Sequence, residues 1–331
     1  MSFSFRFLRL APVLVGLAGL PGLLHAQTNE EVTFRYLASH GSVSPHELAE
    51  ALGYYDGLGV RLENIGYTGG GPESLFALAS GSADIGSAAT PAVINSIVGG
   101  NDFVAAYPSN GIDETVNSTF YVLADSPIRS IQDLPGKTIA VNTLGAHLDY
   151  TIREALRREG LPQNAANLVV VPGPQLEQTL RSGQVDVAAL GYWQATFEGV
   201  LTKNGGVRPV FTDVDVLGEI AGGFVTLRRD FVQAHPDAAR HFVEQAARAA
   251  DWARENLDEA RKVLARILEE RGENPEIAQY WRGFGVRPGA VPTENDLGFW
   301  ISVLEREGSI PAGKLKPADL LFQPQKQARA D

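Results

Sequence analysis

The sequence predicts an α/β fold of two lobes, with mixed, largely parallel sheets and a helical cover near the C-terminus. Short apolar segments alternate with helical segments through the first two thirds of the chain, the pattern expected of layered strands and helices. One segment recurs at a fixed offset, which indicates two lobes built on one plan. The length of 331 residues also favours two domains over one.

Gly, Pro or Asn marks most junctions between the expected elements. Strands are expected at residues 32–38, 60–67, 83–87, 103–107, 119–124, 138–142, 168–171, 186–190 and 209–212. Helices are expected at residues 46–55, 72–80, 91–98, 146–159, 175–182 and 193–202, and almost throughout residues 236–307. The helix that begins at Pro236 carries Ala238, Phe242, Ala246 and Ala249 on one stripe, so we expect it to cover a lobe.

The recurring segment has the same start, length and stop in both copies. The first copy begins at Gly71-Pro72 and ends at Asp84, and the second begins at Gly173-Pro174 and ends at Asp186. The offset is constant, since 174 − 72 and 186 − 84 both equal 102. The alternative is a chance recurrence of a common helix-to-strand turn. Because start, length and stop all agree, we favour an internal structural repeat.

Residues 1–26 have the pattern of a cleaved secretory signal peptide. Arg6 and Arg9 precede an apolar run over residues 10–24, and we expect cleavage after Ala26. The run is short and interrupted by Gly and Pro, which favours a cleaved signal over the alternative, a membrane anchor.

Charge and composition exclude several classes of function. Removal of the signal takes away two arginines and no acid, so the net charge changes from −11 to 26 − 39 = −13. Such a chain repels nucleic acid and anionic lipid, and any anion site must be built locally. The absence of Cys excludes disulfides and thiolate metal sites, and no two histidines have the helical spacing of a metal pair. Signature motifs of nucleotide-binding and hydrolytic enzymes are also missing.

Candidate ligand contacts lie where expected strands end and helices begin, because open α/β sheets bind ligands there. Helix N-termini offer free N–H groups to an anion, and Gly, Ser and Thr allow close approach and add hydroxyl donors. The candidates at these junctions are His40, Ser42, His46, Gly70, Gly71, Ser87, Ala88, Thr90, Thr143, Gly145 and His147. Each junction alone could be an ordinary capped turn, but their number across both halves favours a binding site. Tyr192 and Trp193 follow the expected strand at 186–190 and form either an apolar wall of that site or a core pair.

These stretches resemble the aliphatic sulfonate/taurine/nitrate group of ABC-transporter solute-binding proteins, which also contains thiamine-pyrimidine binders. The matching residues are 69–72 and 75–87, then 126–130, 133–137, 140–147 and 182–186, and finally 228–231 with 235–236. Their order and spacing are most similar to the sulfonate branch. That branch usually has a Trp-Asp-Pro-like run where this chain reads Gly191-Tyr192-Trp193-Gln194-Ala195, which suggests a ligand with a bulkier or aromatic tail.

The resemblance implies a two-lobed, type II periplasmic-binding-protein fold. Lobe I would combine residues 27–114 with 219–331, and lobe II would span 115–218, with crossovers near 109–117 and 213–222. An anion would rest on residues 87–90 and 145–147, and the first-strand loop and Gly222-Gly223 of the return crossover would close over it.

The implied function is capture of a small organic anion in the periplasm by a monomer that delivers it to an ABC permease, without catalysis, cofactor or metal. A sulfonate or sulfate ester is the expected ligand. An aromatic carboxylate, a thiamine-precursor pyrimidine or a sensory role are the alternatives. Thiamine-pyrimidine synthases share the architecture, but their chemistry is associated with a Cys-rich motif. This chain contains no Cys, which argues against that activity.

Overall fold

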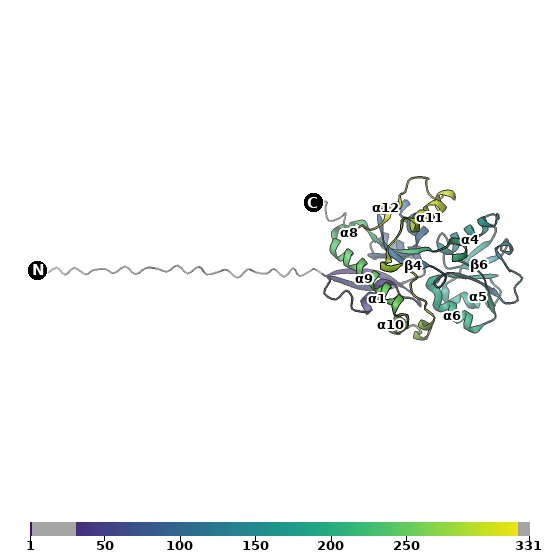
Figure 1. Cartoon of the computed structure of the whole chain (residues 1–331), viewed down its shortest axis with the longest axis horizontal. Coiled ribbons are helices and arrows are strands. Elements are labelled where there is room, and N and C mark those ends of the chain that lie inside the picture. Colours follow the sequence, from purple (N-terminus) through teal and green to yellow (C-terminus); the bar gives the residue numbers. More distant parts are fainter. Residues whose placement is uncertain (2–30, 324–331) are drawn as a thin grey trace. The chain divides into compact units, whose positions relative to one another are not determined.

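Three sheets organise the chain in the computed structural model, which describes Met1 and residues 31–323 (Figure 1). The expected signal peptide therefore lies outside the described residues, apart from Met1. A two-stranded parallel sheet pairs β1 (Val32–Ser39) with β2 (Val60–Thr68). A three-stranded antiparallel sheet has the order β3 (Ile85–Ala89), β10 (Ile220–Arg228), β4 (Phe103–Ile112).

The five-stranded sheet is built only from residues 119–212. Its strands are β5 (Thr119–Leu123), β6 (Thr138–Val141), β7 (Asn167–Val170), β8 (Val187–Leu190) and β9 (Val207–Thr212). They lie in the order β7-β6-β8-β5-β9. Strand β6 pairs in parallel with β7 and β8, whereas β5 runs antiparallel to β8 and β9.

The expected elements agree with these strands, with one omission. No strand was expected between residues 212 and 236, yet β10 is the central strand of its sheet. Because β10 and β5 run against their neighbours, the described sheets are mixed, but parallel pairings do not predominate: three pairings are parallel and four antiparallel.

Helices connect and cover the sheets (Figure 1). They are α1 (Pro45–Ala51), α2 (Gly71–Ala79), α3 (Thr90–Val98), α4 (His147–Arg158), α5 (Leu176–Arg181), α6 (Ala195–Asn204), α7 (Asp213–Leu217), α8 (Arg229–Ala234), α9 (Pro236–Glu255), α10 (Leu257–Glu270), α11 (Glu294–Arg306) and α12 (Pro317–Leu320). The helical expectation for residues 236–307 holds for α9, α10 and α11, but residues 271–293 interrupt it with turns, two short 3-10 helices and irregular chain.

The two copies of the recurring segment share the same backbone conformation and aspartate hydrogen bonds, which confirms the expected structural repeat. Gly81 and Gly183 both adopt a positive φ after their helix, at 75° and 70°. The Asp84 amide donates to the Arg35 carbonyl at 2.8 Å, and its carboxylate accepts from the Arg35 amide at 3.1 Å. Asp186 repeats both bonds with Thr138, at 2.9 and 2.8 Å. Each aspartate thus fixes the segment after its helix to a neighbouring strand.

Separate apolar cores lie around β1 and around β6. Phe34 on β1 stacks on Phe242 of α9 with ring centroids 4.8 Å apart, and the expected apolar stripe of α9 is buried. Around β6, the helix α4 buries Leu148 and Ile152 against Phe120. These two cores hold the strand ends that face the site described below.

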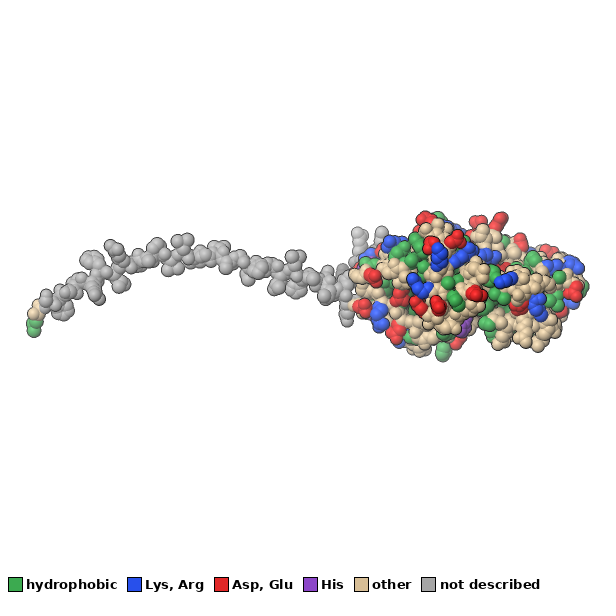
Figure 2. Space-filling model, turned by 90° about the horizontal axis from the view of Figure 1, so that it is seen from below, with side chains coloured by type: hydrophobic (Ala, Val, Ile, Leu, Met, Phe, Trp, Pro, Cys, Tyr) green, Lys and Arg blue, Asp and Glu red, His purple; other side chains and the backbone are tan. Residues whose placement is uncertain are grey.

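The molecular surface carries both signs of charge. Figure 2 shows acidic and basic side chains interspersed on one face, so this face offers no broad cationic surface to a nucleic acid. Within residues 31–323, no helix combines the length and the apolar character needed to cross a bilayer.

Candidate ligand-binding site

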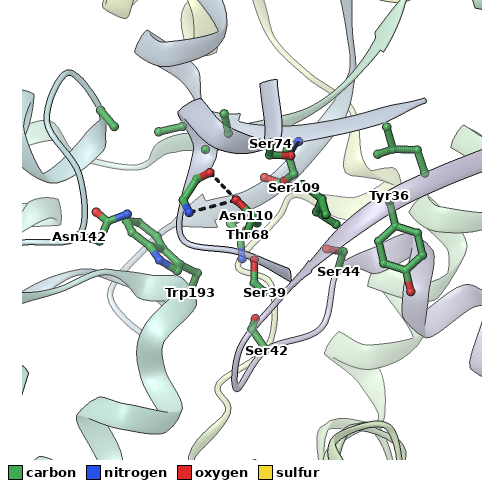
Figure 3. Close-up of a pocket in the computed structure, with 18 of the residues that line it drawn as sticks. Tyr36, Ser39, Ser42, Ser44, Thr68, Ser74, Ser109, Asn110, Asn142 and Trp193 are labelled. Atoms are coloured by element: carbon green, nitrogen blue, oxygen red, sulfur yellow. Dashed lines mark hydrogen bonds between the residues drawn. The ribbon is translucent and has the colours of Figure 1, made fainter. Parts of the chain in front are cut away.

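A cavity of about 90 Å³ lies where strand ends of the first two sheets meet those of the five-stranded sheet (Figure 3). One side is formed by some of the residues in the stretches 36–46, 68–74, 85–89 and 109–110, and the other by Asn142, Thr143, Ala146, Tyr192 and Trp193. Among the described residues, no Lys, Arg, Asp or Glu lines this cavity. A charged ligand would therefore be held by neutral groups.

Three helices present their N-termini to this one cavity. The N-cap residues are Gly70 of α2, Ala89 of α3 and Ala146 of α4, and all three line it. No side chain caps any of these helices, because Gly and Ala carry no acceptor. Uncapped N–H groups and the positive ends of helix dipoles attract negative charge.

Hydroxyl and amide side chains complete the lining, and most are labelled in Figure 3. The hydroxyls are those of Ser39, Ser42, Ser44, Thr68, Ser74, Ser87, Ser109 and Thr143, together with the amides of Asn110 and Asn142. Some are engaged locally: Thr68 Oγ1 donates to the Gly70 carbonyl at 2.7 Å, and Ser74 Oγ accepts from the Ser87 amide at 3.0 Å. The rest of the set can donate to a ligand without bringing charge into the cavity.

Two aromatic residues form one wall. The rings of Tyr192 and Trp193 meet edge to face with centroids 4.7 Å apart, and Figure 3 shows Trp193 beside Asn142. Burial, with the nearby Asp213 charge, raises the pKa of Tyr192 well above its ordinary value, so its hydroxyl stays protonated. This wall suits the non-ionic part of a ligand.

His46 lines the cavity as a neutral imidazole. Its Nδ1 lies 2.8 Å from the Tyr107 hydroxyl, and the side chain is buried. Burial lowers the pKa of His46 to about 4, against a smaller opposing effect of Glu47. His46 therefore contributes no charge near neutral pH.

Nine of the candidate residues line the cavity, namely Ser42, His46, Gly70, Gly71, Ser87, Ala88, Thr143, Tyr192 and Trp193. The structure places the other five, His40, Thr90, Gly145, His147 and Gly223, outside the lining. Ligand contact by any of them stays a prediction.

Each residue outside the lining has another local role. His40 is half exposed and stacks on Tyr67 with ring centroids 4.3 Å apart. Thr90 is buried and donates through Oγ1 to a main-chain carbonyl of β10 at 3.2 Å. Gly145 lies in a separate groove beside α2 and α3. Gly223 packs on β3, where a Cβ would lie 2.8 Å from the Ala88 carbonyl oxygen.

His147 is the most informative of these because it turns away from the cavity. Its Nε2 lies 2.7 Å from Asp213 Oδ2, and both side chains are fully buried. Asp213 also accepts from the Ser118 amide at 2.8 Å, and its own amide donates to the Ser118 carbonyl at 2.9 Å. This His147–Asp213 pair therefore joins the start of α4 to both connections that lead into and out of the five-stranded sheet.

Several lining residues were not among the candidates. Ser39, Ser44 and Thr68 lie next to candidate residues at strand-to-helix junctions, and Ser109 lies on an expected crossover. Their positions in the sequence could therefore have indicated them. Tyr36 had no such signal. Among residues 31–323, no group of three or more His, Cys, Asp or Glu side chains is placed to hold a metal ion.

A family model described as NMT1/THI5 like matches residues 42–260. The chain belongs to the NMT1/THI5-like family. No curated protein sequence matches it. The matched range contains all the cavity-lining residues except Tyr36, Leu37 and Ser39.

Solved structures resemble this NMT1/THI5-like chain at low sequence identity. The alkanesulfonate-binding protein SsuA from Xanthomonas axonopodis, bound to MOPS, has a TM-score of 0.71 at 19% identity, covering 88% of this chain and 99% of that one. The periplasmic aliphatic sulphonate binding protein SsuA from Escherichia coli has a TM-score of 0.68 at 18% identity, covering 88% and 92%. The periplasmic nitrate-binding protein NrtA from Synechocystis has a TM-score of 0.66 at 16% identity, covering 90% and 88%.

These similarities show the fold: the chain has the two-lobed architecture of type II periplasmic binding proteins, as expected. We call the part built on β1–β4 and β10 the first lobe and the part built on β5–β9 the second lobe. The residues at which the lobes begin and end stay a prediction.

Proposed function

We propose that this protein is the periplasmic substrate-binding component of an ABC importer and that its cavity binds a small organic anion, a sulfonate or sulfate ester. The observation that carries the proposal is the convergence of three uncapped helix N-termini, from both lobes, on a cavity without a charged side chain. Family membership and the sulfonate- and nitrate-binding proteins of the same fold support it.

The donors of the cavity are sufficient for useful affinity. Hydrogen bonds to a charged group contribute about 1.5–3 kcal/mol each. On the order of four such bonds contribute about 6–12 kcal/mol, and the upper end of that range, less an association cost of about 4 kcal/mol, reaches the roughly 8 kcal/mol of micromolar binding. Neutral donors also leave the ligand free to dissociate, as delivery to a permease requires.

Ligand binding would favour the closed arrangement of the lobes, because the ligand contacts both. In the described structure, hydrogen bonds already join the two lobes. Thr196 Oγ1 on α6 donates to the Gly41 carbonyl at 3.0 Å, and Asn95 Nδ2 on α3 lies 3.2 Å from the Tyr150 hydroxyl on α4. A permease that recognises the bridged form would accept loaded protein in preference to open protein.

The size of the cavity favours a short ligand. Its volume of about 90 Å³ is smaller than the roughly 150 Å³ of a protein cavity that holds benzene. A second candidate is an aryl sulfonate or aromatic carboxylate, which the Tyr192–Trp193 wall favours. Binding the larger ligand would require the wall or the lobes to move apart.

We propose binding without turnover. His46, the imidazole of the described lining, pairs with the Tyr107 hydroxyl and not with a cavity serine that it could activate as a base. Recovery of unchanged ethanesulfonate after prolonged incubation with purified protein is the expected result. A sensory role would need the same closed form, so the effect of deleting the gene on ligand uptake separates the two roles.

A thermal-shift panel tests the ligand class. It compares methanesulfonate, ethanesulfonate, benzenesulfonate, benzoate and an aminopyrimidine, each at about 100 times its expected Kd, where binding stabilises the protein by about 2.7 kcal/mol. The short sulfonates are expected to raise the melting temperature most. A larger shift with benzenesulfonate or benzoate would select the second candidate, and a shift with the pyrimidine alone would overturn the anion proposal.

A further inference from the structure

Residues 39–44, which are the last residue of β1 and the loop that leads to α1, supply four cavity-lining residues, Ser39, Ser42, Val43 and Ser44. We call this segment the 39–44 loop. It is short, and Gly41 within it has a φ of 67°. Besides a local bond at Ser44, it is held by residues from the far end of the chain.

Two residues just after α10 bind the main chain of this loop. Arg271 Nη1 donates to the Ser42 carbonyl at 2.9 Å, although the two residues are 229 positions apart. Glu273 Oε2 accepts from the Gly41 amide at 2.7 Å. The Gly41 carbonyl accepts from Thr196 of the second lobe, so the segment that Arg271 and Glu273 hold is also the segment on which the second lobe closes.

Arg271 is paired inside the protein with Glu47. The Arg271 side chain is 9% exposed and the Glu47 side chain 3% exposed, and Arg271 Nη2 bonds to Glu47 Oε1. The other carboxylate oxygen, Glu47 Oε2, accepts from the Ser44 amide at 2.6 Å. One buried ion pair therefore holds the loop at two points, through Ser42 and through Ser44.

We infer that the buried Arg271–Glu47 pair positions the 39–44 loop for ligand contact and thereby sets ligand affinity. Neither residue lines the cavity, so both act through the loop as positioning residues. Arg271 also lies beyond residues 42–260, the range that the family model matches. The effect on affinity rests on the proposed function, whereas the effect on loop position does not.

The charge environment of Arg271 agrees with this role. Burial works to lower the pKa of Arg271, but the Glu47 carboxylate, with Tyr36 and Glu273, outweighs burial and raises it. The guanidinium therefore stays charged, and its planar group can bond the Ser42 carbonyl and the carboxylate together. A binding site whose loop is preorganised in this way avoids an ordering cost when the ligand arrives.

The test separates positioning from general stability by removing the charges one at a time and together. Arg271→Gln leaves the buried Glu47 carboxylate without its partner and should lower the melting temperature. Glu47→Gln with Arg271→Gln removes both charges and should restore much of the melting temperature, because the side-chain amide oxygen introduced at position 47 can still accept from the Ser44 amide. Arg266→Gln is the matched control, since Arg266 lies on the exposed side of α10 and bonds only the Ala51 carbonyl among the described residues.

Two readouts are needed. Hydrogen exchange of the 39–44 segment, measured by mass spectrometry without ligand, should be at least about tenfold faster in Arg271→Gln and in the double variant. Their Kd for ethanesulfonate, measured by calorimetry, should be weaker by about tenfold or more, while Arg266→Gln matches the parent protein.

Each outcome decides one claim. Unchanged exchange in the double variant would overturn the positioning role. Faster exchange with an unchanged Kd would overturn the effect on affinity. If the parent protein itself fails to bind ethanesulfonate, the proposed ligand is wrong, and the exchange rates still decide whether the Arg271–Glu47 pair positions the loop.

Discussion

Replacing His147 by Ala should cost far more stability than its place at a helix start suggests. His147 and Asp213 are both fully buried, and the His147 Nε2 contact at 2.7 Å is one of two side-chain hydrogen bonds that the Asp213 carboxylate makes. The variant leaves that carboxylate with the Ser118 amide alone. Removing one partner of a buried pair costs about 3–5 kcal/mol, since the remaining charge is buried without compensation.

The assay is urea unfolding followed by tryptophan fluorescence at pH 7. We expect a loss of about 3–5 kcal/mol for His147→Ala and partial recovery in His147→Ala with Asp213→Asn, because the second change removes the uncompensated charge. His40→Ala is the control: His40 is half exposed, and its change should stay within about 1 kcal/mol. A cost below about 1 kcal/mol for His147→Ala, or no recovery in the double variant, would show that His147 does not compensate the buried Asp213 charge.

Three further predictions concern pH, packing and the repeated aspartates. The pKa of His46 falls from 6.5 to about 4 on folding, so the unfolded chain takes up the proton first, and stability should fall by about 3 kcal/mol as the pH drops from 6.5 to 4. Urea titrations at both pH values should show this loss, and His46→Gln should lack it; equal pH slopes would contradict the assignment. Gly222→Ala should weaken ethanesulfonate binding, because a Cβ there overlaps the Tyr192 phenol that lines the cavity; an unchanged Kd by calorimetry would be inconsistent with that wall. Asp84→Asn should cost about 2 kcal/mol and Asp186→Asn about 1 kcal/mol in urea unfolding, because Asp84 is buried and Asp186 exposed; the reverse order would argue against the role given to the two aspartates.

Most strands and helices could be predicted because apolar segments end at Gly, Pro or Asn along this chain. Strand β10 escaped prediction although it is buried along nearly its whole length. Its Gly222-Gly223 pair has the composition of a turn, and only pairing with β3 and β4 makes it a strand. Pairing between segments more than 100 residues apart is not encoded in local pattern.

The site could be predicted in part for a related reason. The rule that ligands bind at strand ends identified nine cavity-lining residues, because strand ends of both lobes meet there. The rule does not say which way a side chain points. Thr90 and His147 both begin helices, yet Thr90 bonds a carbonyl of β10 and His147 bonds Asp213, 66 residues further along the chain. The rule could not identify Arg271, because Arg271 bonds the Ser42 carbonyl although the two residues are 229 positions apart in the chain.

We propose that helix N-termini and neutral donors of both lobes bind negative charge in this cavity. Calorimetry of the dialysed protein with ethanesulfonate and with ethyl methyl sulfone, a neutral analogue of similar shape, tests it most directly. We expect micromolar binding of ethanesulfonate and no measurable binding of the sulfone. Equal affinity for the two compounds would contradict it, since the cavity would then recognise shape without charge.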